Sequence, residues 1–162
     1  MSRLSRVIVS LGSNVSPAEN LRRAVQLLRS RQTVLQVASV WETPAVGASG
    51  PNFYNSAVCL LTSDSPIALK DRVLRPIEAE LGRVRTADKF APRPIDLDPV
   101  IVDNTILDEH LWEYAYLALP IAELCPDLTH PQTHDRLFDV ARQLQRFSPA
   151  ILHPEMFETF GQ

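Results

Sequence analysis

The stretch RVIVSLGSNVSPAENLRRAVQLLRSR, residues 6–31, carries a β-strand signal followed by a helix signal. Its first part is rich in β-branched residues and is interrupted by Gly12. Ser16 and Pro17 are residue types favoured at a helix N-cap and at the first helical position. Four apolar residues then recur at helical spacing: Leu21, Ala24, Val25 and Leu28. Arginines occupy the opposite face of this helix. We therefore predict a strand over residues 6–14 and a helix from Pro17 to about Arg31, packed on a sheet.

Two further strand signals follow this unit. They are TVLQVASVWETP (33–44) and FYNSAVCLLTS (53–63). The loop between them, from Thr43 to Pro51, is long for a hairpin turn, so we expect it to act as a binding element.

A second helix is predicted from Ile67 to Leu81. Pro76 should kink or break this helix, and Gly82 is a suitable C-cap. The remaining predicted elements are a strand that includes Asp96 and Asp98, a short proline-bounded helix within YLALPIAELCPDL (116–128), and an amphipathic helix over residues 136–147.

The order strand, helix, strand, strand, helix, strand is that of the split βαβ or ferredoxin-like pattern. We predict an α+β fold with helices on one face of an antiparallel sheet. Residues 1–162 are expected to form a single domain of this kind. Because this fold supports many activities, it does not by itself specify one.

The composition bounds the class of protein. With 45% hydrophobic and 22% charged residues and a formal net charge of −3, the chain lacks the broad positive surface of a nucleic-acid-binding protein. No apolar run has the roughly 20 residues that a membrane span requires. Cys59 and Cys125 each lie in an apolar run, as reduced core thiols do. We expect a cytoplasmic protein with small-molecule partners, a monomer rather than a dimer, with no nucleic acid and no membrane partner.

Two carboxylates stand close together in RPIDLDPVIVDN, residues 93–104. In a strand, Asp96 and Asp98 share one face, while Ile95, Leu97, Pro99 and Ile101 take the other. Like charges this close repel each other. They need a metal ion or an arginine nearby, or a wet strand end that screens them.

Basic residues lead directly into this pair in GRVRTADKFAPRPIDLD, residues 82–98: Arg83, Arg85, Lys89 and Arg93. Arginines bind phosphoryl oxygens in a bidentate manner, and carboxylates hold Mg²⁺, which bridges further phosphoryl oxygens. A polyphosphate substrate would therefore satisfy both sets. The alternative is an ion-pair network that fixes a loop to the sheet edge.

Six segments, in order and at similar spacing, carry a resemblance to a known family: SLGSN, TPAVG, FYNSAV, IEAELGRVR, APRPIDLD and LPIAELCPDL. Together they resemble the 6-hydroxymethyl-7,8-dihydropterin pyrophosphokinase family over about residues 6–128. The resemblance implies a ferredoxin-like fold and a folate-pathway transferase. Such an enzyme transfers pyrophosphate from ATP, its co-substrate, to the hydroxymethyl group of the pterin, giving AMP, with two Mg²⁺ ions.

Matched position by position, the resemblance implies a role for each residue on the phosphate side. Asp96 and Asp98 would be the metal ligands, and they would be catalytic together with Arg83 and Arg93, which match phosphate-binding arginines. Arg85 and Lys89 match basic residues of a mobile loop. Glu78 matches a residue on the nucleotide side.

The resemblance also implies a pterin site. Thr43 and Asn55 would hydrogen-bond the polar edge of the ring, and Phe53 and Tyr116 would lie against its flat faces. Pro44, Val46 and Gly47 would shape the adjoining backbone, and Phe90 stands on the loop that closes the site. Without the resemblance, Phe53 and Tyr116 are better interpreted as ordinary core aromatics.

This sequence departs from the family on the nucleotide side. Only WEYA, residues 112–115, stands where the family has a longer segment that contacts ATP. Lys89 replaces an arginine and loses the bidentate fork, and Pro99 cannot donate an N–H. The alternative function is therefore a divergent paralogue that binds a pterin-like heterocycle with weak or no pyrophosphoryl transfer.

Overall fold

The structure, a computed structural model, describes residues 3–47, 49–88 and 90–158. The strands are β1 Ser5–Ser13, β2 Thr33–Val37, β3 Val40–Thr43, β4 Phe53–Thr62, β5 Asp96–Val102, β6 Thr105–Ile106 and β7 Ile151–His153. The helical elements are α1 Pro17–Arg31, α2 Pro66–Leu69, the π-helical η1 Lys70–Leu74, α3 Arg75–Glu80, the 3₁₀-helical η2 Glu109–Trp112, α4 Ala115–Leu124, α5 Leu137–Phe147 and α6 Glu155–Glu158. None of the described helices is long and apolar enough to cross a bilayer.

The strands form one sheet in the order β6-β5-β1-β4-β3-β7, and β2 also pairs with β4. Every pairing is antiparallel. The two central strands, β1 and β4, are each followed by a helix and then by a strand on the far side of the other. This arrangement is the ferredoxin-like split βαβ topology, so the predicted fold is confirmed.

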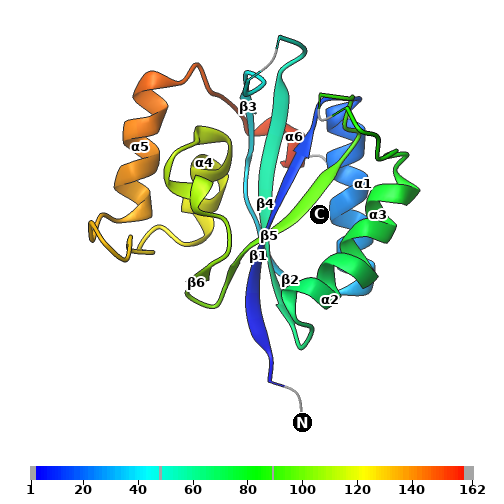
Figure 1. Cartoon of the computed structure of the whole chain (residues 1–162), viewed down its shortest axis with the longest axis horizontal. Helices are drawn as coiled ribbons and strands as arrows, with labels where there is room; N and C mark the ends of the chain where they lie inside the picture. Colours follow the sequence, from blue (N-terminus) through cyan, green and yellow to red (C-terminus); the bar gives the residue numbers. More distant parts are fainter. Residues whose placement is uncertain (1–2, 48, 89, 159–162) are drawn as a thin grey trace.

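Helices cover both faces of the sheet, contrary to the prediction of one face (Figure 1). Successive side chains of β1 point in opposite directions: Val7 and Val9 belong to the cluster under α1, α2 and α3, whereas Ile8 belongs to the cluster under α4 and α5. The C-terminal part of the chain, for which the sequence predicted two helices but no place in the fold, thus supplies a second layer.

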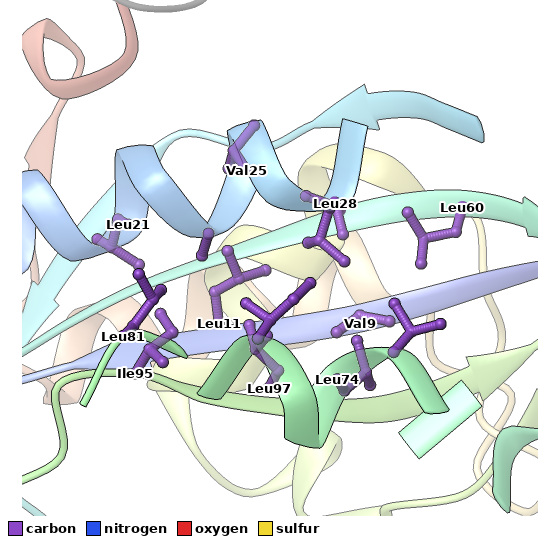
Figure 2. Packing of buried hydrophobic residues seen from close by; sticks show 14 of the residues in the cluster. Val9, Leu11, Leu21, Val25, Leu28, Leu60, Leu74, Leu81, Ile95 and Leu97 are labelled. Atoms are coloured by element: carbon purple, nitrogen blue, oxygen red, sulfur yellow. The ribbon is translucent and has the colours of Figure 1, made fainter. Parts of the chain in front are cut away.

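The first cluster fixes the start of β5 against β1 (Figure 2). Leu21 and Leu28 of α1 pack with Leu11 of β1 and Leu97 of β5, and all four are buried. Burying a leucine side chain contributes roughly 1.5–3 kcal/mol. Because Leu97 faces this core, its neighbours Asp96 and Asp98 must face the other side of the sheet.

The second predicted strand is two strands rather than one. The run 33–44 breaks between β2 and β3, where Ala38 N–H donates to the Ala57 carbonyl at 2.8 Å and Ser56 Oγ donates to the Ala38 carbonyl at 2.9 Å. Both segments still pair with β4. The break redirects β3 toward the loop that follows Thr43.

The predicted helix over 67–81 continues past Pro76 by means of a π turn. Arg75 N–H donates to the Lys70 carbonyl, five residues back, so one extra residue is accommodated next to the proline. Pro76 therefore neither ends the helix nor leaves a gap in it. The helix ends at Glu80, Leu81 is its C-cap, and Gly82 follows with a φ of 95°, as expected for a glycine at that point.

Strand β5 contains a bulge that overturns one predicted side-chain direction. Val9 pairs with Pro99, but Ile8 pairs with Ile101, so Val100 is the extra residue. Ile101 consequently joins the cluster under α4 rather than the face of Leu97.

The predicted N-cap, Ser16, precedes α1 but makes no side-chain cap and has a φ of 40°.

Candidate active site

A cavity of about 180 Å³ lies where β1, β3, β4, β5 and the start of α4 meet. Six of the predicted substrate residues line it: Thr43, Pro44, Val46, Phe53, Asn55 and Tyr116. Asp96 and Asp98 border the same cavity, so the structure brings both predicted halves of the site together.

The polar wall of the cavity is a pair of buried side chains. Asn55 and Thr43 are only 3% and 4% exposed. Asn55 Nδ2 donates to Thr43 Oγ1 at 2.9 Å and to the Trp41 carbonyl at 3.0 Å. These bonds hold the amide in one orientation, and the pairing of Gly12 with Asn55 opens the cavity beside it because glycine adds no side chain there.

Aromatic rings approach the cavity from two elements. Phe53 starts β4 and Tyr116 lies in the first turn of α4, and both are half-buried. The Tyr116 ring is stacked with that of Tyr114, with centroids 5.6 Å apart. Burial, together with the nearby charge of Asp108, raises the pKa of Tyr116, which therefore stays a neutral phenol.

The remaining predicted substrate residues lie at the mouth of the cavity. Gly47 and Phe90 line a second hollow of about 490 Å³, which shares Val46, Phe53 and Tyr116 with the cavity. The Phe90 side chain is 55% exposed. Lys89, the predicted loop cation, lies outside the described residues.

The two carboxylates stand at the start of β5, opposite β1. Asp96 is hydrogen-bonded by Arg83 and by Arg93, the latter at 3.1 Å, and Asp98 is paired with Lys70 at 3.1 Å. Burial works to raise the pKa of Asp96, but Arg83 and then Arg93 outweigh it, and the pKa is lowered. Burial and the charge of Asp96 raise the pKa of Asp98.

Glu78 of α3 connects these ion pairs, because it binds both Arg83 and Lys70. It is 2% exposed and accepts from Lys70, from Arg83 at 3.0 Å and from Arg85 at 2.9 Å. The Leu97 N–H also donates to it, at 2.8 Å. The resemblance implied a nucleotide contact for Glu78, and its carboxylate here faces cations of the chain itself.

The result is one continuous series of ion pairs, Arg93–Asp96–Arg83–Glu78–Lys70–Asp98, with Arg85 attached at Glu78. Four cations face three carboxylates, which leaves an excess of one positive charge. Such a surface favours an anion. The sequence left open either an ion-pair network or a metal and phosphate site, and the free protein has the network.

A divalent cation fits the carboxylate pair. Mg²⁺ is bound by one or two carboxylates and takes its other oxygens from water and phosphate. Asp96 and Asp98 share a face of β5 and border one cavity, which meets that requirement. Over the described ranges, no group of three or more acidic, histidine or cysteine side chains could hold a metal ion by itself.

Lys70 is the site residue that the sequence did not reveal. It comes from η1, a turn that looked like ordinary helix, and no motif includes it. Pro76 was the only local signal of the irregularity that places it.

The part of the site that the resemblance assigns to the nucleotide is built from short connections. After η2 the chain reaches α4 through residues 113–114, which confirms that the segment is short. His110 Nδ1 lies 2.9 Å from Asp108 Oδ1, and Asp108 lines the cavity. Pro99 lies on the part of β5 that β6 does not reach, where a missing N–H costs no sheet hydrogen bond on that edge.

Comparison with known proteins gives one family. The model described as 7,8-dihydro-6-hydroxymethylpterin-pyrophosphokinase matches residues 8–126. A Pseudomonas aeruginosa protein named 2-amino-4-hydroxy-6-hydroxymethyldihydropteridine pyrophosphokinase is 34% identical over 140 residues, which cover 79% of this chain and 85% of that protein.

Longer proteins also match. The fission yeast "Folic acid synthesis protein fol1" is 33% identical over 148 residues, 84% of this chain but only 20% of that protein. The crystal structure of wild-type Plasmodium falciparum HPPK-DHPS with STZ-DHP has a TM-score of 0.71 at 10% identity, and the match covers 99% of this chain and 45% of that one. This chain thus spans a fifth of one relative and less than half of the other, and the structural likeness supports the fold.

Proposed function

This chain belongs to the 7,8-dihydro-6-hydroxymethylpterin-pyrophosphokinase family, and on that basis we propose that it transfers pyrophosphate from ATP to 6-hydroxymethyl-7,8-dihydropterin, giving AMP and the pterin diphosphate. One observation carries the proposal. A single cavity joins a buried amide and hydroxyl pair, two aromatic rings and a carboxylate pair flanked by arginines. Because one chain supplies all of these groups, we propose that it acts as a monomer.

The pterin would bind between the aromatic rings. Asn55 and Thr43 would pair with the polar edge of the heterocycle, and Phe53 and Tyr116 would lie against its faces. Each aromatic contact of this kind contributes about 0.5–1.5 kcal/mol beyond area burial. Pro44 and Val46 would close the side of the cavity and Phe90 its mouth, which excludes water from the hydroxymethyl group.

The triphosphate would bind to the arginines. Arg83, Arg93 and Arg85 would donate to its oxygens, and Lys89 stands on the same loop in the sequence. Arginine forks match phosphate oxygens in pairs. When Arg83 and Arg93 donate to phosphate oxygens instead of to Asp96, the Asp96 carboxylate would become available to a metal ion. Glu78 would act through the arginines that it holds.

Asp96 and Asp98 would hold the magnesium ions. The resemblance implies two such ions. When bound, Mg²⁺ neutralises the phosphate charge and makes the β-phosphorus more electrophilic. The chain's own contribution would be position: the cavity would hold the pterin with its hydroxymethyl group toward the carboxylate pair, next to the arginines that would bind the triphosphate. Fixing two reactants in this way removes several kcal/mol of the barrier.

The test is turnover with the two aspartates replaced one at a time. Asp96→Asn and Asp98→Asn should each lower AMP formation by about 10³-fold, because the amide binds metal poorly. Pterin affinity, read from tryptophan quenching, should change little. Asp103→Asn is the matched control, since Asp103 directly follows the same strand, does not line the cavity, and has a φ of 53° that Asn tolerates. Full activity in either site variant would exclude the proposed metal ligands.

The alternative, a pterin-binding protein without transfer, rests on the short segment at 112–115 and on Pro99, and the family match does not favour it. Calorimetry separates the two. Such a protein would bind the pterin with the same heat whether or not Mg²⁺-ATP is present, whereas the proposed enzyme would bind Mg²⁺-ATP in its own right.

A further inference from the structure

Lys70 is held on three sides beneath the carboxylate pair. Its Nζ lies 3.1 Å from Asp98 Oδ1 and 3.2 Å from Glu78 Oε2, and it donates to the Leu97 carbonyl at 2.5 Å. Its side chain is only 15% exposed, whereas that of Asp98 is 50% exposed. The ammonium is therefore an internal group of the site, while Asp98 remains open to the cavity.

The π turn is what places Lys70 there. In a regular α-helix, residues about seven apart return to the same face after two turns, and a residue eight apart is rotated off that face. Lys70 and Glu78 are eight apart and meet directly. The extra residue of η1 restores their alignment, and π turns of this kind are frequent at functional sites.

Both members of the carboxylate pair consequently have a cation from the chain itself. Asp96 has Arg83 and Arg93, and Asp98 has Lys70. The arginines of Asp96 can turn to an incoming polyphosphate. Lys70 is anchored by Glu78 and by the Leu97 carbonyl, so it stays beside Asp98. A positive charge fixed at about 3 Å from a metal-binding oxygen opposes a second cation there.

We propose that Lys70 is a positioning residue that acts as the built-in counter-ion of Asp98. It neutralises and orients this carboxylate in the free protein and weakens the binding of a bare divalent cation. Metal then binds well only together with a polyphosphate, whose negative charge offsets the ammonium. This inference rests on the proposed function in one respect, that the aspartate pair is where the cation binds.

The test measures Mn²⁺ binding to the free protein by electron paramagnetic resonance, with no nucleotide and no pterin present. Lys70→Met removes the charge and keeps the length of the side chain. We expect it to bind Mn²⁺ about tenfold more tightly than the wild type, because the opposing charge is gone. A residue that only stabilised the fold would give the reverse, a looser site with weaker binding.

Three variants bracket this result. Lys70→Arg keeps the charge and should stay within about twofold of the wild type. Arg31→Met removes a surface ion pair away from the site, because Arg31 of α1 is the partner of Glu80 on α3. This variant should leave Mn²⁺ binding unchanged. Asp98→Asn added to Lys70→Met should abolish the gain.

Unchanged or weaker Mn²⁺ binding by a folded Lys70→Met variant would overturn the proposal. If that variant does not fold, Lys70→Gln, which can still donate to the Leu97 carbonyl, is measured against the same expectation and the same refutation. The test is independent of turnover: tighter Mn²⁺ binding with no AMP formation would refute the proposed function and leave the role of Lys70 standing.

Discussion

Glu78 is a buried carboxylate that holds three cations of the site in place. A buried charge is costly unless partners satisfy it, and removing one member of such a group leaves the others uncompensated. Here Lys70 and Arg83, whose side chains are 15% and 12% exposed, would each lose one of two carboxylate partners and keep only Asp98 and Asp96, respectively. Glu78 therefore determines both the stability of this region and the direction of the arginines.

The neutral variant Glu78→Gln should lower the free energy of unfolding by about 3 kcal/mol, because two largely buried cations each lose one of their two carboxylate partners. Urea denaturation measures this. The matched control is Glu80→Gln on the same helix, whose carboxylate is 47% exposed and pairs with Arg31, and which should change stability by about 0.5 kcal/mol. Equal effects of the two variants would refute the role of Glu78.

Gly12 has no side chain and therefore leaves space in the cavity. A Cβ placed there would lie 3.7 Å from Asn55 Oδ1 and 3.9 Å from Phe53 Cδ1, which are ordinary contacts, and Gly12 lines the 180 Å³ cavity. Gly12→Ala should fold with a melting temperature close to that of the wild type. The added methyl group should weaken pterin binding by about tenfold, as the loss of roughly one fitted group does. Unchanged pterin affinity in fluorescence titrations would place the pterin elsewhere.

Strand β7 is attached to β3 by an ionic contact as well as by backbone pairing. His153 Nε2 lies 2.8 Å from Glu42 Oε1, and its Nδ1 lies 2.9 Å from Glu155 Oε1. Glu42 also accepts from Asn52 at 2.9 Å, across the base of the loop that carries Pro44 and Val46. The C-terminal strand thus supports the loop at the mouth of the cavity.

This contact should make stability depend on pH. Desolvation acts to lower the pKa of His153, but the hydrogen bonds with Glu155 and Glu42 outweigh it and raise the pKa above the usual 6.5. A raised folded-state pKa means that the contribution is complete below about pH 6.5 and is lost as the pH rises through the folded value.

The variant His153→Gln should therefore lower the free energy of unfolding by about 1 kcal/mol near pH 6 and by much less near pH 9. Thermal denaturation across this range measures the difference. His134→Asn is the control, because His134 is exposed and Asn tolerates its φ of 62°. A constant difference between His153→Gln and wild type at all pH values would contradict the ionic contact.

Elements whose signals are local could be predicted from the sequence. The β1–α1 unit was predicted within a residue or two, because its alternation, its proline at the helix start and its apolar stripe all lie within one short segment. Strand β7 could not be predicted, since three residues become a strand only by pairing with β3. The π turn and the β5 bulge were missed for the related reason that each depends on packing against other elements.

The whole molecule is a sheet with helices on both faces, and the site lies at one end of it (Figure 1). The first cluster fixes β5 against β1, and the second carries α4 with Tyr116 over the same end. The order of segments along the chain could suggest the ferredoxin-like fold. It could not show that α4 and α5 cover the second face, because an amphipathic helix does not specify which surface it covers.

The residues of the candidate site could likewise be predicted only in part from the sequence. Thr43, Asn55, Asp96 and Arg83 could be named from motifs, and the structure brings them around one cavity region. Lys70 could not, because its position results from a helical irregularity. The direct pairing of Asp96 with both arginines could not be chosen in advance either, since the sequence allowed a metal, arginines or solvent at that point.

In the proposed reaction, the β- and γ-phosphates of ATP are transferred together to the pterin hydroxymethyl oxygen, and AMP is released. Phosphorus NMR of the purified protein with Mg²⁺, ATP and 6-hydroxymethyl-7,8-dihydropterin tests it most directly. We expect AMP and a pterin diphosphate in equal amounts, and neither product with Asp96→Asn. ADP with a pterin monophosphate, or unchanged ATP beside a pterin that is bound, would contradict it.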